Sequence, residues 1–155
     1  MQNDLGVLYL QKGDTGRARV ALLKAVELQP DLAEAWANLG LMALQSGRLT
    51  EAEESLMNAI ENGASNPEIG YSLGIARMNL QNLEGAEEIL RRNLFEWPQH
   101  ADTYMALGIV LERRGLNQEA IRIYERGRLV IPDDPRFIRQ LRRLWDPPNN
   151  RSFMP

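Results

Sequence analysis

Hydrophobic and small residues recur along the chain at a fixed interval of thirty-four positions. The leucines of this register are Leu5, Leu39, Leu73, Leu107 and Leu141. Glycine follows the first four of them, and alanine recurs with the same step at Ala18, Ala52, Ala86 and Ala120. Small side chains are needed where paired helices approach closely. A period of this length therefore predicts an all-α fold, built as a stacked array of helix-turn-helix units.

Each period contains two helical stretches joined by a short turn. We expect first helices at about 1–12, 33–46, 67–80 and 101–114, and second helices at about 15–28, 49–62, 83–97 and 117–130. Asn66 and Asp134 each precede a proline, an arrangement typical of a capped helix start. The chain is thus divided into repeats 1–32, 33–66, 67–100 and 101–134, a capping helix at 135–145, and an extended tail at 146–155.

The second repeat reads Trp36-x-x-Leu39-Gly40-x-x-Ala43, followed by Ala52, Leu56 and Ala59, and the fourth reads Tyr104-x-x-Leu107-Gly108-x-x-Leu111. Both resemble the tetratricopeptide repeat. The resemblance covers residues 1 to about 134. It implies a right-handed superhelical solenoid of antiparallel helix pairs that acts as a protein–protein interaction scaffold.

The third repeat departs from the pattern. Gly70 stands where repeats two and four carry a large aromatic residue, and Asn93 stands where the other repeats carry a late small residue. Glycine inside a helix costs about 1 kcal/mol relative to alanine. Either the joint between repeats two and three is simply weaker, or it is a flexible point that adjusts the curvature of the array to a partner.

The resemblance also implies that the first helix of each repeat lines a concave groove. Mapped onto this chain, the peptide-binding candidates are Asn38, Leu41, Leu44, Tyr71, Ile75, Met78, Met105 and Ile109. Repeated aliphatic residues on an open groove form an apolar binding strip. The alternative is that these side chains are ordinary core, buried between adjacent helices.

An acidic edge, formed by Glu34, Glu68 and Asp102, accompanies the apolar strip. Together they predict an amphipathic protein or peptide partner with basic residues on one side. The lysines and arginines by which some family members bind a terminal carboxylate are replaced here by residues such as Asn3, Glu68 and Ser72. Capture of a carboxylate terminus is therefore not expected.

Charge is distributed unevenly. Residues 27–88 contain eleven acidic and two basic residues, whereas residues 113–155 contain ten arginines and five acidic residues. This asymmetry is compatible with a solvated surface, with steering of a charged partner, or with self-association as a homo-oligomer. Nucleic-acid binding is not favoured, because the chain is acidic overall and its aromatic residues are not interleaved with basic ones.

The sequence offers no catalytic or cofactor-binding constellation. His100 is the single histidine, and the chain contains no cysteine. We therefore expect neither an enzyme nor a bound cofactor or metal. No membrane span or signal peptide is recognisable, so a cytoplasmic location is expected. Met1 falls inside the first expected helix, which favours a fragment of a larger protein. The tail segment Ser152–Met154 is a candidate occupant of the chain's own groove or of a neighbour's.

Overall fold

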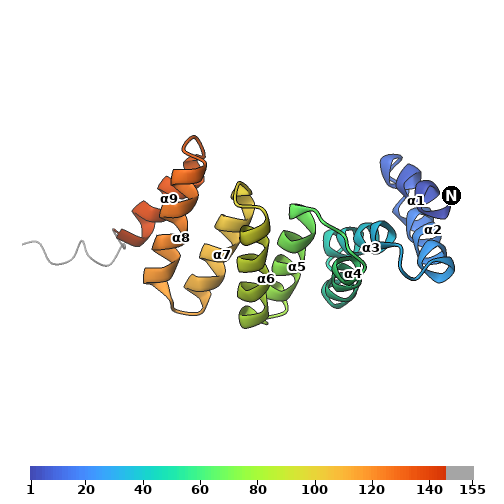
Figure 1. Cartoon of the computed structure of the whole chain (residues 1–155), viewed down its shortest axis with the longest axis horizontal. Helices are drawn as coiled ribbons and strands as arrows, with labels where there is room; N and C mark the ends of the chain where they lie inside the picture. Colours follow the sequence, from blue (N-terminus) through green and yellow to red (C-terminus); the bar gives the residue numbers. More distant parts are fainter. Residues whose placement is uncertain (146–155) are drawn as a thin grey trace, which may run out of the picture. The chain divides into compact units, whose positions relative to one another are not determined.

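The computed structural model describes residues 1–145, which form two compact units divided between residues 82 and 83. The first unit contains α1 (Gln2–Gln11), α2 (Thr15–Leu28), α3 (Ala33–Gln45), α4 (Leu49–Glu61) and α5 (Pro67–Asn79). The described part of the second contains α6 (Leu83–Glu96), α7 (Ala101–Arg113), α8 (Asn117–Val130) and α9 (Pro135–Trp145). The division falls in the turn between α5 and α6 (Figure 1), one helix later than the weak joint expected between repeats two and three.

Helix pairs are the building blocks of both units. In the first, α1 packs on α2 and α3 on α4, while α2 packs on α3 and α4 on α5 to join successive pairs. In the second, α7 packs against α6 and α8, and α9 packs against α8. The expected caps at the two proline starts are confirmed, because Asn66 accepts a hydrogen bond from the backbone of Glu68 at 2.8 Å and Asp134 from that of Arg136 at 2.9 Å.

The recurring glycines permit close helix contact. A Cβ atom on Gly40 would lie 2.6 Å from Cγ of Leu56, and one on Gly6 would lie 2.6 Å from Cγ of Leu22. The side chain that fills the space beside each of these glycines, Leu22 or Leu56, lies one turn after Ala18 or Ala52 on the second helix. The alanines remain essential to packing, since Ala18 and its equivalents are fully buried.

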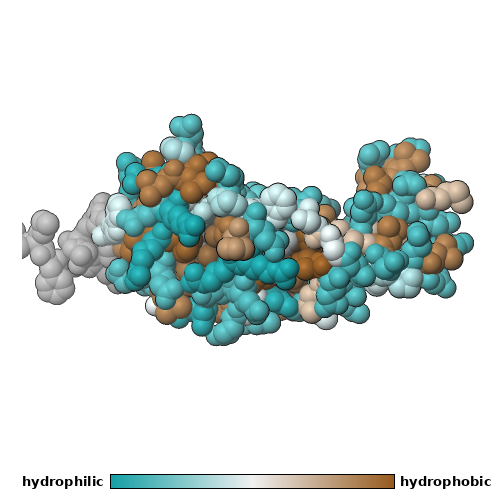
Figure 2. Space-filling model, viewed as in Figure 1, coloured by the Kyte–Doolittle hydropathy of each residue, from teal (hydrophilic) through white to brown (hydrophobic). Residues whose placement is uncertain are grey.

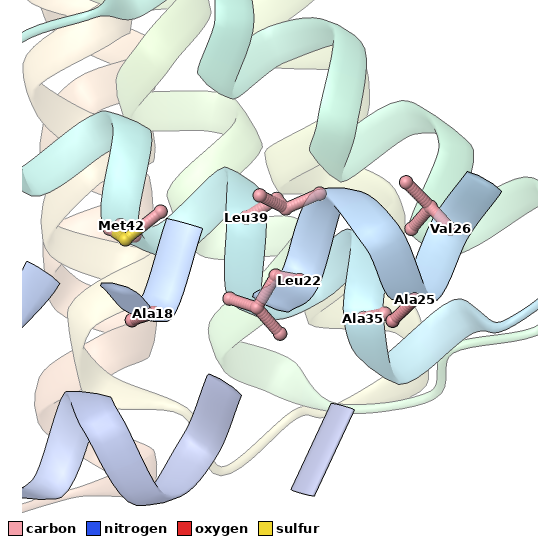
Figure 3. Packing of buried hydrophobic residues seen from close by; sticks show 7 residues of the cluster. All are labelled: Ala18, Leu22, Ala25, Val26, Ala35, Leu39 and Met42. Carbon is pink, nitrogen blue, oxygen red and sulfur yellow. The ribbon is translucent and has the colours of Figure 1, made fainter. Parts of the chain in front are cut away.

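The core between the first two helix pairs is apolar. Figure 3 shows this packing between α2 and α3, where Leu22, Val26, Leu39 and Met42 lie along the two helices beside small alanines. Each of these large side chains is less than one-tenth exposed. Burial of this kind stabilises a repeat array through contacts between nearest neighbours.

The aromatic and proline positions of the repeat are linked by a hydrogen bond. Trp36 donates its indole N–H to the carbonyl oxygen of Pro30 at 2.7 Å, and Tyr104 donates its hydroxyl to that of Pro98 at 3.2 Å. Each bond closes the loop that precedes a first helix. The third repeat lacks this bond because Gly70 replaces the aromatic donor.

Candidate binding cleft

The first unit contains a cleft of about 540 Å³ formed by α1, α3, the start of α5 and the loop that precedes α5. Its apolar lining includes Val7, Ala37, Leu41 and Ile69. Val7 and Leu41 are partly exposed, whereas Ala37 and Ile69 are buried. The loop contribution, Gly63–Asn66, could not be inferred from helix periodicity because it has none.

Polar groups lie beside this apolar lining. Asn38 on α3 donates an amide hydrogen bond to Oδ1 of Asn3 on α1 at 3.2 Å, which links the two helices at the cleft. Glu34 and Glu68 also line it, and both residues are exposed. The lining includes no lysine, arginine or histidine. The cleft therefore combines an apolar floor, a pair of amides and two carboxylates.

A model of the tetratricopeptide repeat matches residues 3–67 and 71–133, most of the chain. The chain belongs to the tetratricopeptide repeat family. It is accordingly a protein-interaction scaffold of the all-α solenoid class. The gap between the two matched ranges contains Gly70, the point at which the third repeat departs from the aromatic pattern.

Several solved structures share this fold. A crystal structure of MamA is 26% identical, with a TM-score of 0.86 over 91% of this chain and 82% of that one. YrrB, described as a tetratricopeptide-repeat protein with an unusual peptide-binding site, is 20% identical with a TM-score of 0.84 over 97% and 78%. PilF of Pseudomonas aeruginosa is 23% identical with a TM-score of 0.77 over 92% and 65%. No curated protein sequence is significantly similar to the chain.

Only some of the predicted groove residues of this chain lie together at the cleft. Asn38, Leu41, Glu34 and Glu68 line the cleft of the first unit. Leu44 packs against a buried alanine cluster, and Tyr71 and Ile75 lie partly exposed on α5. Met78 on α5 and Met105 on α7 are only 8% and 9% exposed, so they present little surface to a ligand. Ile109 is partly exposed on α7, in the second unit.

Asp102 of the predicted acidic edge lies in the second unit and is paired. Nη1 of Arg136 on α9 contacts its Oδ1 at 2.5 Å. Arg136 also pairs with Asp134, and this hydrogen-bonded contact holds the pKa of Asp134 below its ordinary value. Asp102 is therefore a contact point for the capping helix, and the carboxylates at the cleft are Glu34 and Glu68.

Glu112 on α7 stands where repeats two and three carry the apolar residues Leu44 and Met78, and its contacts explain the difference. The hydroxyl of Tyr124 donates to its Oε1 at 2.7 Å, and Arg143 on α9 forms an ion pair with its other oxygen. Burial of Tyr124, together with this hydrogen bond to a carboxylate, raises the pKa of the phenol. Glu112 thus joins α7, α8 and α9.

Candidate chemistry other than binding is sparse in the part of the chain that the structure describes. Residues 1–145 include no group of three or more histidine, cysteine, aspartate or glutamate side chains placed to hold a metal ion. Among the same residues, no helix has the length and apolar character required to cross a membrane. The predicted tail at 146–155, including Ser152–Met154, lies outside the described residues.

Proposed function

We propose that the cleft of the first unit binds an extended segment of a partner protein that carries a lysine or arginine beside an apolar side chain. The observation that carries this proposal is the composition of the cleft, in which two carboxylates flank an apolar floor and no basic residue is present. A cationic side chain would meet only complementary or neutral groups there.

The paired asparagines suit an extended backbone. With the amide of Asn38 donating to Asn3, the remaining acceptor of Asn38 and the remaining donor of Asn3 are available to a ligand. A peptide backbone in extended conformation offers alternating N–H and C=O groups that match such a pair. A cleft of about 540 Å³ lies within the range of small-ligand pockets, and we expect it to hold a few residues of the partner.

Leu41 is the central apolar anchor of this proposal, because it lies in the cleft and remains partly exposed. Tyr71 and Ile75 extend the candidate surface along α5, and Ile109 is a separate candidate contact in the second unit. Met78 and Met105 contribute mainly to packing.

Charge reversal at the cleft tests the proposal. Fluorescent peptides that alternate lysine or arginine with leucine would be titrated against the protein, beside peptides with glutamate in place of the basic residues. We expect the basic set to bind and Glu34→Lys/Glu68→Lys to weaken binding by about tenfold or more, because two favourable charge contacts become repulsive. Leu41→Asp should also weaken it, by removing the apolar anchor.

The matched control is Glu27→Lys/Glu61→Lys, which changes two exposed carboxylates of α2 and α4 outside the cleft. It makes the same change in net charge and should leave peptide affinity within about twofold of the original at moderate salt. Circular dichroism would establish that all variants keep their helicity. Equal binding of acidic and basic peptides, or equal losses in both double variants, would reject the cleft as the site.

A further inference from the structure

The second unit contains the second helices of two successive repeats, α6 and α8. Both α6 and α8 pack against α7, and an ion pair between Arg91 on α6 and Glu119 on α8 at 3.0 Å links the two helices. They belong to successive repeats, so residues thirty-four apart occupy equivalent places on two helices that run in the same direction. The sequences of their outer faces can therefore be compared residue by residue.

A large apolar side chain projects from each helix near its C-terminal end. Phe95 on α6 is 89% exposed, and Leu129, at the equivalent place on α8, is 74% exposed. Hydrophobic surface gathers at the end of this unit where α8 turns into α9 (Figure 2). The equivalent residues of the first unit are the exposed glutamates Glu27 and Glu61, so the fold itself does not require apolar residues there. Exposed apolar residues in register indicate a contact surface.

The charges that precede these apolar residues have opposite signs on the two helices. One and two turns before Phe95, α6 carries Arg91 and Glu88; at the equivalent places α8 carries Glu125 and Arg122. Glu88, Arg91 and Arg122 are exposed, and Glu125 is partly exposed. Arg91 also pairs with Glu87 at 2.6 Å, within its own helix. The outer face of α6 is therefore the electrostatic complement of the outer face of α8.

A two-fold axis parallel to the helices brings these faces together. Such an axis places α6 of one copy against α8 of the second copy, with the helices pointing the same way and in register. Glu88 then meets the second copy's Arg122, Arg91 meets its Glu125, and Phe95 meets its Leu129. Each contact occurs twice. Arg92 and Arg126 are also at equivalent places and carry the same charge. The repulsion between Arg92 and the second copy's Arg126 is reduced by Glu96, which pairs with Arg92 at 3.0 Å.

We propose that the α6–α8 face, made of Glu88, Arg91, Phe95, Arg122, Glu125 and Leu129, is a dimer interface between two copies of this chain. The face carries two acidic and two basic residues in alternating positions. A partner of one charge sign, such as a nucleic acid or an anionic membrane, would meet repulsion at half of them. A second copy matches both signs and covers both apolar side chains.

Sedimentation velocity of the whole chain, over concentrations from micromolar to near-millimolar, tests this interface. We expect a reversible monomer–dimer equilibrium that Phe95→Ser/Leu129→Ser weakens by about tenfold or more, since each dimer loses four buried apolar side chains. The control Val20→Ser/Leu28→Ser removes two residues that are 69% and 64% exposed on α2 and should leave the equilibrium unchanged. A wild-type chain that remains monomeric throughout the series would overturn the proposal.

A charge swap tests the pairing itself. Glu88→Arg and Arg122→Glu, each alone, place like charges opposite one another twice per dimer and should raise the dimer dissociation constant by about tenfold. The double variant restores opposite signs and should return it to within about threefold of the original value. Glu54→Arg, at the equivalent place on α4, is the control for net charge and should have no effect. A double variant no better than either single variant, or a control as weak as they are, would contradict this interface.

The dimer test is independent of the peptide test. The α6–α8 face lies in the second unit and the cleft in the first. Substitutions in the α6–α8 face should therefore weaken dimerisation and leave peptide binding intact. Substitutions in the cleft should weaken peptide binding and leave dimerisation intact.

Discussion

At the scale of single residues, the turns between paired helices show how one position can depart from an otherwise fixed geometry. Gly13, Gly47 and Gly115 occupy equivalent turns with φ of 74°, 73° and 77°. The third repeat places Gln81 there, with φ of 63°. A side chain in this left-handed region costs about 1–2 kcal/mol because its Cβ crowds the backbone, whereas glycine adopts the conformation without that cost.

Replacement of Gln81 by glycine should therefore stabilise the protein. We expect the free energy of unfolding to rise by about 0.5–1 kcal/mol. The gain is smaller than the strain removed at positive φ, because glycine has a larger conformational entropy in the unfolded chain. Urea denaturation followed by circular dichroism measures the change. Gln45→Gly, at the last residue of α3, is the contrasting control and should lower stability, by up to about 1 kcal/mol. A loss of stability in Gln81→Gly would show that the side chain contributes more than its strain costs.

Two residues show what could not be predicted from the sequence. Asp102 was expected on the acidic edge, and Glu112 stands where repeats two and three place the groove candidates Leu44 and Met78. Both carboxylates are instead held by arginines of α9 that lie thirty-four and thirty-one residues later. Periodicity assigns a residue to a face of its helix but does not identify which distant side chain reaches that face. The cleft loop at Gly63–Asn66 was missed for the related reason that it lies between two periodic segments.

At the scale of elements, α9 is joined to the last pair by apolar and polar contacts together. Phe137 is fully buried and meets Tyr104 edge-to-face, with ring centroids 6.4 Å apart. Arg136 and Arg143 add the ion pairs to Asp102 and Glu112. Arg142 stands in the register that Gly40 and Gly108 occupy, where a following helix would need a small residue. These features support the expected capping role of α9.

Ion pairs of the second unit should make its stability depend on pH. Burial opposes ionisation of Glu87, but hydrogen bonds from Arg91 and Arg114 outweigh this, and its pKa lies below the ordinary 4.5. The pKa of Asp134 lies below the ordinary 3.8 because Arg136 bonds to it. Depressed values mean that these carboxylates bind protons more readily in the unfolded chain. Their contribution to the free energy of unfolding is therefore complete at pH values above the ordinary pKa. It is lost as the pH falls through the lower pKa values of the folded protein.

Urea denaturation at neutral pH and at about pH 3 measures this loss, and the arginine partners provide the comparison. We expect Arg114→Gln/Arg136→Gln to be less stable than the original at neutral pH and to differ from it less in acid, because the carboxylates are then largely protonated. Arg113→Gln/Arg128→Gln removes the same charge from exposed positions on α7 and α8, where neither arginine contacts Glu87 or Asp134. An equal pH dependence in both double variants would contradict a specific role for these pairs.

The helices themselves were well predicted, for a physical reason. Helix α2 occupies 15–28 and α8 occupies 117–130 as expected, and the other described helices begin and end within one residue of the predicted limits. Positive-φ residues recur every thirty-four positions, at 13, 47, 81 and 115, so each repeat has the same turn between its paired helices. The cleft was only partly predictable: Asn38, Leu41, Glu34 and Glu68 follow the register, but the bond from Asn38 to Asn3 depends on how α1 and α3 meet.

At the scale of the whole molecule, each of the two units carries a separate candidate function. The first contains the acidic cleft, and the second contains the self-complementary α6–α8 face. Family membership supports a protein-interaction scaffold without deciding between these surfaces. Because helices of a repeat array contact mainly their neighbours, damage to one unit should remain local. The binding activities proposed for the two units can therefore be impaired one at a time.

Paired alanine substitutions test this locality. Ala52 in the first unit and Ala86 in the second are both fully buried at equivalent positions. Enlargement of either to leucine should cost about 1–3 kcal/mol by overpacking its helix pair. Hydrogen exchange of the whole chain should then show lost protection in α3–α5 for Ala52→Leu and in α6–α8 for Ala86→Leu, with the other unit little changed. Each variant serves as the control for the other. Equal loss of protection throughout residues 1–145 in both variants would mean that the units unfold as one cooperative body.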